Sequence, residues 1–295
     1  MKIQTLIIWL LTLISLLTFA QNNQVSPTIA YAQGIVQTNA TFFDTEGYNV
    51  FLQVFEYNFD EKGINKVKKK FSIPKETIAN EDTEFPNAKI LLTLDTNGES
   101  KTHSIYYLIS GGQGKIKVIG FSTLADRVKT IEREFYEAIL SNSLPKNIYT
   151  PMQVDTIQFA GRGINLGPAC LWRGIRNIQC PDKGQMSWTE LSSLDRAKQI
   201  TAGQKANNAN LKMGKVLEDT EVDILFEGQP TKVLKRKLKI TIPQFIMGGS
   251  NILIIYYVTT EVRGRYVSCV LSHYTDDIGA KKLPPLLKEV MELKE

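Results

Sequence analysis

The sequence predicts an α+β protein of two tandem units, each an antiparallel sheet with helices packed on one face. Two observations favour this class. The chain ends in two apolar runs followed by a helical pattern, and a similar arrangement occurs earlier in the chain. With 43% apolar and 22% charged residues, the composition is that of an ordinary globular protein. A length of 295 residues suits two units better than one large core.

The last part of the chain carries the clearest strand and helix patterns. Segments 252–258 and 266–272 are short and rich in β-branched and aromatic residues. This predicts two strands joined across the polar segment 259–265. Leucine and valine recur at three- and four-residue spacing in segment 283–293, which has prolines near its start. A helix is therefore predicted there, because proline is tolerated in the first turn.

The hairpin pattern also occurs 150 residues earlier. Identical residues recur at this one ungapped offset in the pairs 105–107 and 255–257, Gly114 and Gly264, and Ser122 and Ser272. These identities favour an internal duplication. The alternative is convergence, because any two hairpins share apolar alternation and a turn glycine. In the first copy a helix is predicted at 126–141, with Asp126 as its N-cap.

The N-terminal segment 1–20 has the parts of a secretory signal peptide. Lys2 gives a basic start, residues 7–17 are apolar, and cleavage is expected after Ala20. The alternative is a retained membrane anchor, but the apolar run is shorter than the ~20 residues of a spanning helix. No other stretch is long or apolar enough to span a bilayer. The segment and the Asn- and Gln-rich start that follows resemble exported proteins of the Bacteroidetes, which implies the periplasm or the exterior.

The first unit is expected at 48–144, after a polar and turn-rich lead-in at 21–47. Strands are predicted at 49–58, 64–73, 88–95 and 101–109. The last two flank the turn Asn97-Gly98, which is the strongest short hairpin signal. The string 95–99 also resembles the opening of a calcium loop. It lacks the distal acidic ligand, so the hairpin is favoured.

A linker is expected at 145–154 and the second unit at 155–295. Ser187 and Glu190 have the spacing of a capping box, which predicts a helix that starts at Trp188 and continues to about residue 208. A hairpin is also predicted in this unit, with strands at 221–227 and 231–242. Each unit thus ends in a hairpin and a helix.

The three cysteines set the predicted redox chemistry. Cys170 and Cys180 bracket a short segment and are predicted to form a disulfide, since an exported chain enters an oxidising compartment. Cys269 lies in a predicted strand, where a small buried hydrophobic residue is expected. An odd cysteine count leaves an unpaired thiol or an intermolecular bond. Short-spaced Cys or His pairs are absent from the sequence, so neither a metal nor a cofactor is predicted.

The basic residues do not predict a nucleic-acid partner. The net charge is +5, with dense basic runs at 66–70 and 232–239. Apolar residues interrupt the second run, as on a strand with one solvated face, and stacking aromatic residues do not accompany it. An acidic partner or an anionic surface is the alternative.

The end of each unit resembles a known fold group. A closing strand ends near Ser122 in the first unit and near Ser272 in the second, and a terminal helix follows after a short loop. This arrangement resembles the end of domains of the Mog1/PsbP/DcrB-like fold group, here in tandem. The resemblance implies an accessory or binding role without enzymatic activity. It implies no particular ligand, and it carries over no functional residues.

Two functional classes follow. The first is an exported noncatalytic binding or accessory protein, whose partner would be a protein or another envelope component. It is favoured because the sequence shows no constellation of acid, base, nucleophile or metal ligands. The alternative is a hydrolase or thiol enzyme, with a catalytic site around His273, Asp276 and Asp277 after the closing strand. The two aspartates are equally typical of a solvated loop.

A binding surface is expected between the two halves. Segment 170–188 combines two cysteines, two tryptophans and two arginines. Trp172, Arg173, Arg176 and Trp188 are candidate surface residues, because aromatic residues and arginine anchor many interfaces. For the tryptophans, the alternative is burial in the core.

Overall fold

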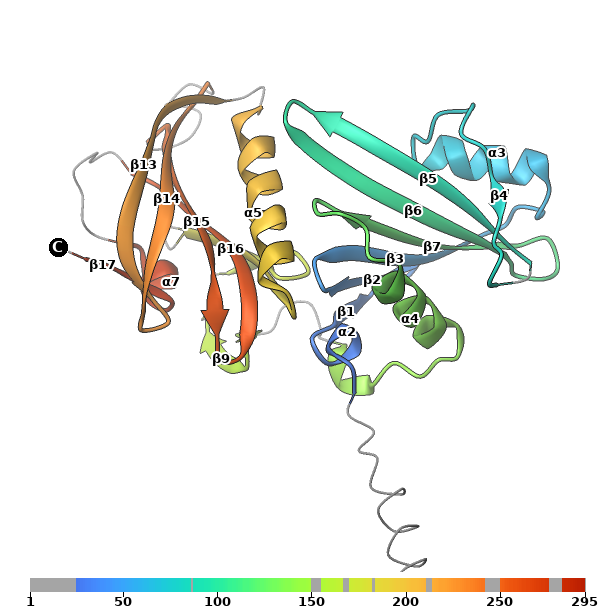
Figure 1. Ribbon diagram of the computed structural model, residues 1–295, viewed down its shortest axis with the longest axis horizontal. Coiled ribbons are helices and arrows are strands. Elements are labelled where there is room, and N and C mark those ends of the chain that lie inside the picture. The colour runs from blue at the N-terminus through green and yellow to red at the C-terminus, as the bar shows by residue number, and fades with distance from the viewer. Residues whose placement is uncertain are drawn as a thin grey trace, which may run out of the picture.

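The structure is a computed structural model that describes residues 25–85, 87–149, 155–166, 170–181, 184–210, 214–241, 250–275 and 283–294. In this part of the chain two large antiparallel sheets carry helices, so the fold is α+β as predicted (Figure 1). The expected signal peptide at 1–20 lies outside the described residues.

The first sheet, within the described ranges, has seven strands in the order β1-β2-β3-β7-β6-β5-β4. The strands are β1 (Gln33–Val36), β2 (Ala40–Thr45), β3 (Tyr48–Phe55), β4 (Asn80–Glu81), β5 (Ala88–Asn97), β6 (Ser100–Ser110) and β7 (Ile116–Thr123). The predicted hairpin is confirmed between β5 and β6, with Gly98 and Glu99 rather than Asn97 and Gly98 as the two turn residues. Gly98 has a φ of 61°, a conformation that glycine adopts without a Cβ clash.

Helices lie on both faces of the first sheet. The helices of this half are α2 (Pro27–Ala30), α3 (Glu61–Lys70), α4 (Lys129–Leu140) and the 3-10 helix η1 (Lys146–Ile148). Phe135 of α4 shares a core with Tyr107, whereas Val67 of α3 shares another with Leu108. Neighbouring residues of a strand point to opposite faces. The expectation of helices on one face is therefore not confirmed (Figure 1).

The second sheet has eight strands in the described ranges, in the order β10-β11-β12-β16-β15-β14-β13-β17. The strands are β10 (Leu171–Gly174), β11 (Asn177–Cys180), β12 (Gly184–Leu191), β13 (Gly214–Phe226), β14 (Gln229–Ile240), β15 (Ile252–Val262), β16 (Arg265–Tyr274) and β17 (Met291–Leu293). A separate hairpin consists of β8 (Thr156–Phe159) and β9 (Arg162–Asn165). The predicted hairpin of the last apolar runs is confirmed as β15 and β16.

The helices α5 (Leu194–Ala209) and α7 (Pro285–Lys288) lie on opposite faces of the second sheet. Thr201 of α5 has its hydroxyl oxygen 2.7 Å from that of Ser268 on β16. Leu287 of α7 shares a core with Cys269, the next residue of the same strand. The main core of this half therefore lies on the α7 side, and α5 covers the other side.

The two sheets share one order of strands. Read from one edge, β4-β5-β6-β7-β3-β2-β1 corresponds to β13-β14-β15-β16-β12-β11-β10. A helix follows the corresponding strands β3 and β12, namely α3 in the first half and α5 in the second. The strand β17 has no counterpart in the described part of the first sheet. The repeated arrangement is thus present as a topology, and an origin by duplication stays a prediction.

Residues that match at the ungapped offset of 150 do not lie on corresponding faces of the two sheets. Tyr107 of β6 lies in the core under α4. Its sequence match Tyr257 on β15 accepts a hydrogen bond from Asn208 of α5, the counterpart of α3. A one-residue slip exchanges the two faces of a strand, because side chains alternate with a period of two. The matching triplets 105–107 and 255–257 therefore occupy opposite faces.

The expected lead-in at 21–47 is wrong for its described part, which belongs to the first sheet. β1 and β2 lie within it, and Ile35 and Phe43 are buried. Glu46 and Gly47 have φ values of 48° and 76° and form the two-residue turn between β2 and β3. These residues therefore mark a hairpin rather than the end of a loose segment.

The strand predicted at 64–73 is wrong, because most of this segment belongs to helix α3. Asp60 caps the helix by accepting a hydrogen bond from the Gly63 amide at 2.7 Å. Lysines end the helix, where positive charge interacts favourably with the helix dipole. Ile64 and Val67 are buried at helical spacing, but two apolar residues in a basic segment are too few to distinguish a helix from a strand.

The helix predicted from Trp188 begins six residues later, at Leu194. β12 continues to Leu191 because it pairs with β16 along its length. Ser193 is the N-cap and accepts a hydrogen bond from the Arg196 amide. Glu190, expected in the capping box, is buried and accepts a hydrogen bond from Arg265. Long-range strand pairing thus overrode a local capping signal.

The two terminal helices also differ from prediction. Val128 rather than Asp126 occupies the N-cap of α4, and the Asp126 carboxylate accepts a hydrogen bond from Gln199. The helix predicted at 283–293 is limited to the four residues of α7. β17 then pairs with β13, which gives the last apolar residues a strand partner that the sequence pattern could not reveal.

Candidate functional site

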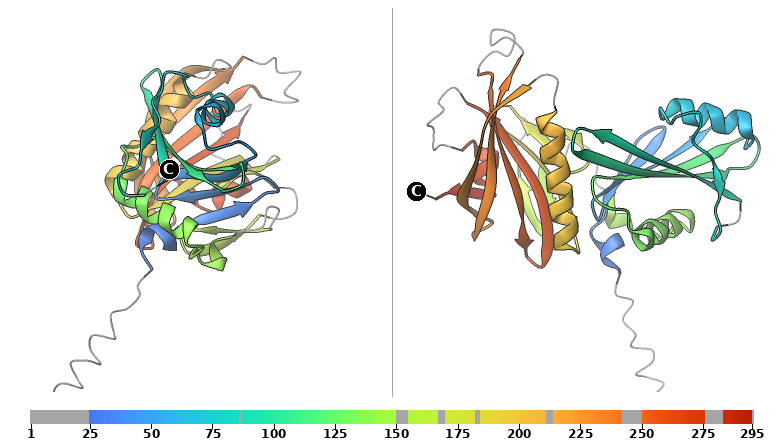
Figure 2. Two further views of the ribbon diagram at one scale, coloured as in Figure 1. Left: turned by 90° about the vertical axis from the view of Figure 1, so that its right-hand side faces the viewer. Right: turned by 45° about the horizontal axis from the view of Figure 1, so that its top comes forward.

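The two halves meet along a seam formed by α5 and the β10–β11 hairpin. Arg196 of α5 donates hydrogen bonds to the carbonyl oxygens of Glu46 and Asp126 in the first half. Leu191 and Ala197 pack in a small core with Ala125. Figure 2 shows α5 between the second sheet and the ends of β5 and β6. The seam therefore combines buried charge, hydrogen bonds and apolar contact.

Arg176 is the central charge of the seam. Its guanidinium donates to the carboxylate of Asp44 at 2.8 Å, to the Gln33 side chain at 3.3 Å and to the Tyr31 carbonyl. A carboxylate oxygen of Glu190 lies 3.9 Å away. The Arg176 side chain is only 4% exposed. This predicted binding residue joins the two halves and is not available to an external partner.

Burial dominates the electrostatics of the seam. It raises the pKa of Asp44 to about 6, although the charge of Arg176 and the Thr189 hydrogen bond act in the opposite direction. Perturbed carboxyl groups are common at active sites, but structural ion pairs perturb them as well. The partners of Asp44 are groups that hold the halves together, which favours the structural role.

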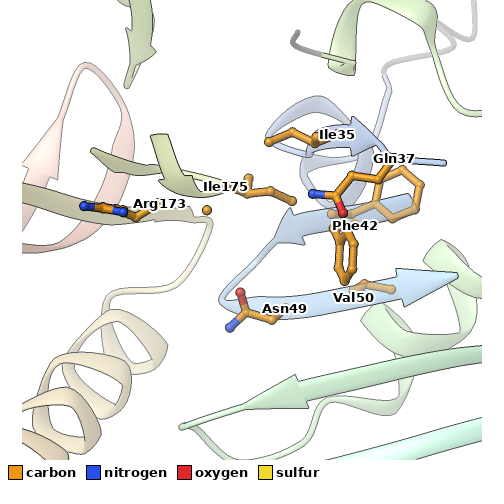
Figure 3. Close-up of a pocket in the computed structure, with 9 residues that line it drawn as sticks. Ile35, Gln37, Phe42, Asn49, Val50, Arg173 and Ile175 are labelled. Carbon is orange, nitrogen blue, oxygen red and sulfur yellow. The ribbon is translucent and has the colours of Figure 1, made fainter. Parts of the chain in front are cut away.

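A cavity of about 310 Å³ opens beside this network, here termed the seam cavity. It is lined by Ile35, Gln37, Phe42, Phe43, Asn49, Val50, Arg173, Gly174 and Ile175. In Figure 3, Ile175 points toward Gln37 and the strands of the first sheet, whereas Arg173 points away from them. Phe42 is 38% exposed, so an aromatic wall of the cavity faces solvent.

The predicted surface residues divide into two groups. Trp172 and Trp188 are 8% and 3% exposed and belong to the core of the second half. Phe159 meets Trp188 edge to face, with ring centroids 5.9 Å apart. Arg173 is exposed at the rim of the seam cavity. Both tryptophans are therefore buried in the core, which was the alternative to a role at the surface.

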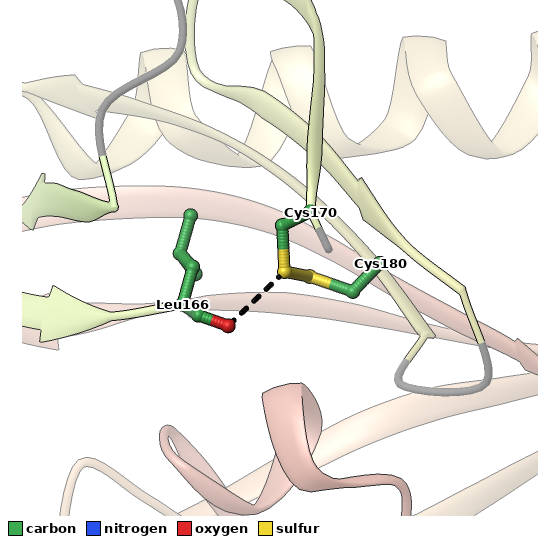
Figure 4. Close-up of a disulfide and its surroundings, with 3 residues drawn as sticks. All are labelled: Leu166, Cys170 and Cys180. Carbon is green, nitrogen blue, oxygen red and sulfur yellow. Dashed lines mark hydrogen bonds between the residues drawn. A yellow bond between two sulfur atoms is a disulfide. The ribbon is translucent and has the colours of Figure 1, made fainter. Parts of the chain in front are cut away.

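The predicted disulfide between Cys170 and Cys180 is present, with an S–S distance of 2.03 Å (Figure 4). It closes the β10–β11 hairpin one position beyond the pair Leu171 and Gln179. Cys269 is a free, fully buried thiol, and burial raises its pKa. A thiol that stays protonated and inaccessible is a poor nucleophile.

His273 lies at the end of β16 and is buried. Its ring stacks on Tyr256, and Nδ1 lies 3.3 Å from the carbonyl oxygen of Tyr274. Burial lowers the pKa of His273. The candidate partners Asp276 and Asp277 lie outside the described residues. Within the described ranges, no three His, Cys, Asp or Glu side chains are grouped so as to hold a metal.

A second concave site begins between α5 and the second sheet and continues over the ends of β12 and β16, where no described residue of α5 lines it. One cavity of about 360 Å³ is lined by Gln185, Ser187, Gln204, Asn207, Asn208, Leu253, Ile255, Val270 and Ser272. A cavity of about 330 Å³ shares Gln185, Leu253 and Ser272 with it and reaches His273 and Tyr274. The two together are termed the amide groove.

Sequence reasoning missed the amide groove. Its one local signal is the spacing of Gln204, Asn207 and Asn208, which places three amides on one face of a helix.

Comparisons with known proteins identify no family. No protein-family model matches the chain, and no curated protein matches it. Among solved structures, the di-domain ARO/CYC StfQ from the steffimycin biosynthetic pathway aligns at 11% identity over 89% of this chain and 80% of that chain, with a TM-score of 0.16. This score is too low to support an argument about fold or function. Separately, the described helices include none with the length and apolar character needed to cross a bilayer.

Proposed function

We propose that the chain is an exported noncatalytic binding or accessory protein, and that the seam cavity receives its ligand. The main support for the proposal is that residues of both halves line this cavity. Arg176, next to the cavity residue Ile175, fixes one wall to the other through Asp44. Preformed concave sites at the junction of two structural units are a usual location of ligand sites.

The lining of the seam cavity sets the chemistry of the ligand. Ile35, Phe42 and Ile175 form apolar walls. Asn49 adds an amide, which both donates and accepts hydrogen bonds. A small molecule or a partner side chain with an apolar body and one polar group fits this lining. Its apolar part supplies affinity, and the amide supplies orientation.

The noncatalytic role is supported by the state of the cysteines, which are the candidate nucleophiles. Cys170 and Cys180 are joined to each other, and Cys269 is buried in the core. The alternative function, a hydrolase around His273, is supported by the position of this residue at the amide groove. A screen of ester and amide substrates tests it. Turnover that His273→Asn abolishes would favour the enzyme over the binding protein.

Export is proposed from the predicted signal peptide together with the disulfide. Disulfides persist in oxidising compartments and are rare in the reducing cytosol. Mass spectrometry of the protein from its native cells is expected to find a mature N-terminus at Gln21 in the envelope or the medium. A chain that retains Met1 in the cytosol would contradict export.

Ligand binding at the seam cavity is testable with a dye that has both apolar and polar parts. We expect 1-anilinonaphthalene-8-sulfonate to bind and to be displaced by small aromatic or aliphatic amphiphiles. Ile175→Arg should weaken dye binding at least about tenfold, because a partly buried apolar wall becomes charged. Leu171→Arg is the matched control, since Leu171 is 50% exposed and lies outside the lining. Equal dye affinity in both variants would exclude the seam cavity as the site.

A further inference from the structure

The amide groove has a regular floor made by three adjacent strands. Gln185 of β12 and Ile255 of β15 both pair with Ser272 of β16, so these three residues form one row. Ser187 and Val270 pair in the next row on the same face. The floor therefore presents both apolar and hydrogen-bonding groups on one face of the sheet.

The hydrogen-bonding side chains of the first cavity of the groove are neutral. They are the amides and hydroxyls of Gln185, Ser187, Gln204, Asn207, Asn208 and Ser272. Over the described lining of both cavities, neither Asp, Glu, Lys nor Arg is present. A charged ligand would lose water without gaining an opposite charge, which is costly. The groove therefore favours an uncharged ligand.

Part of this hydrogen-bonding capacity is not used inside the protein. Gln204 accepts a hydrogen bond from Ser268, which anchors that amide to the sheet. By contrast, the side chains of Ser187, Asn207 and Ser272 make no hydrogen bond to another residue in the described part of the chain. These three groups are partly exposed, so they are open to a ligand.

The combination matches the chemistry of a sugar. Each hydroxyl of a sugar donates and accepts a hydrogen bond, as amides and serine hydroxyls do. Leu253 and Ile255 offer apolar contact to the ring. At the far end Tyr274 is 47% exposed, and the negative face of an aromatic ring attracts the C–H groups of a pyranose. Each cavity falls in the range of about 300–1,000 Å³ that is usual for small-molecule sites.

We propose that the amide groove binds a neutral oligosaccharide, with successive sugar units lying from Asn207 to Tyr274. This site is separate from the seam cavity, since the two share no described lining residue. The protein would then hold a glycan on its second half and another ligand at the junction of the halves.

The test uses the full mature chain and an array of neutral and acidic oligosaccharides. Glucans and mannans are the neutral probes, and polyuronides are the acidic ones. We expect binding to neutral probes alone, confirmed by isothermal titration with the best probe. Asn207→Ala and Ser272→Ala should each weaken binding at least about tenfold, because each removes a hydrogen-bonding group facing the groove. Lys198→Ala is the control, an exposed position of the same helix.

The outcomes separate the two proposed sites. Binding of acidic probes only, or of none at millimolar concentration, would overturn the glycan proposal. Neutral binding that survives both groove variants would overturn it as well. Thermal unfolding of each variant, compared with the wild type, identifies a loss caused by misfolding. Ile175→Arg at the seam cavity should leave glycan binding unchanged, so either proposal is open to failure without the other.

Discussion

Asp44 illustrates at the residue scale what a buried charge does to stability. Burial raises its pKa in the folded protein from 3.8 to about 6. Between these values the folded state binds the proton more readily than the unfolded state does. The free energy of unfolding that Asp44 contributes is therefore present in full below about pH 4 and is lost as the pH rises through about 6.

Asp44→Asn is expected to remove this component of the pH dependence. The free energy of unfolding of the wild type minus that of the variant should fall by on the order of 3 kcal/mol from about pH 4 to about pH 7. Urea unfolding at several pH values measures it. Asp82, Asp219 and Glu227 have lowered pKa values, but they titrate in both proteins and cancel in the difference. A difference that does not change with pH would contradict the raised pKa.

The cysteines give a second prediction at the residue scale. The native protein should show no reactive thiol with a disulfide reagent, because Cys269 is fully buried. Denaturation without a reductant should expose one thiol per chain, and reduction should expose all three. Release of more than one thiol before reduction would contradict the pairing of Cys170 with Cys180.

At the element scale, helix α3 is stabilised by its N-cap residue, Asp60. This cap can be recognised in the sequence once the position of the helix is known. Asp60→Ala should lower the free energy of unfolding by about 1 kcal/mol, because the Gly63 amide loses its acceptor. Chemical denaturation measures this. Lys62→Ala is the control at an exposed position of the same turn, with an expected change within about 0.5 kcal/mol. Equal effects would show that the cap contributes little.

The presence of helix α5 was predicted, but the way it packs was not. Ala197 and Ile200 pack toward the first half, whereas Thr201 and Gln204 bond to the second sheet. A helix with protein on two sides needs no single apolar stripe. Its amphipathic signal is therefore weak, although the helix is well packed. The amide groove was missed for the same reason, since it depends on which face of α5 meets the sheet.

At the scale of the whole molecule, the seam should make the two halves unfold together. Arg176→Ala leaves Asp44 buried without its charge partner, which is expected to cost about 3–5 kcal/mol. Arg173→Ala, three residues away and exposed, should change the free energy of unfolding by about 0.5 kcal/mol or less. Calorimetry should find one transition in the wild type. Two well-separated transitions in the wild type would show that the halves are independent.

The sequence by itself determined the α+β class, the hairpins β5–β6 and β15–β16, and the pairing of Cys170 with Cys180. These features depend on side-chain period, turn residues and short spacing, which are local properties. Only the tertiary structure decided that segment 33–45 forms strands, that α5 begins after Leu191, and that Arg176 is buried. Each of these results from contacts between residues far apart in the chain, and local propensity does not encode such contacts.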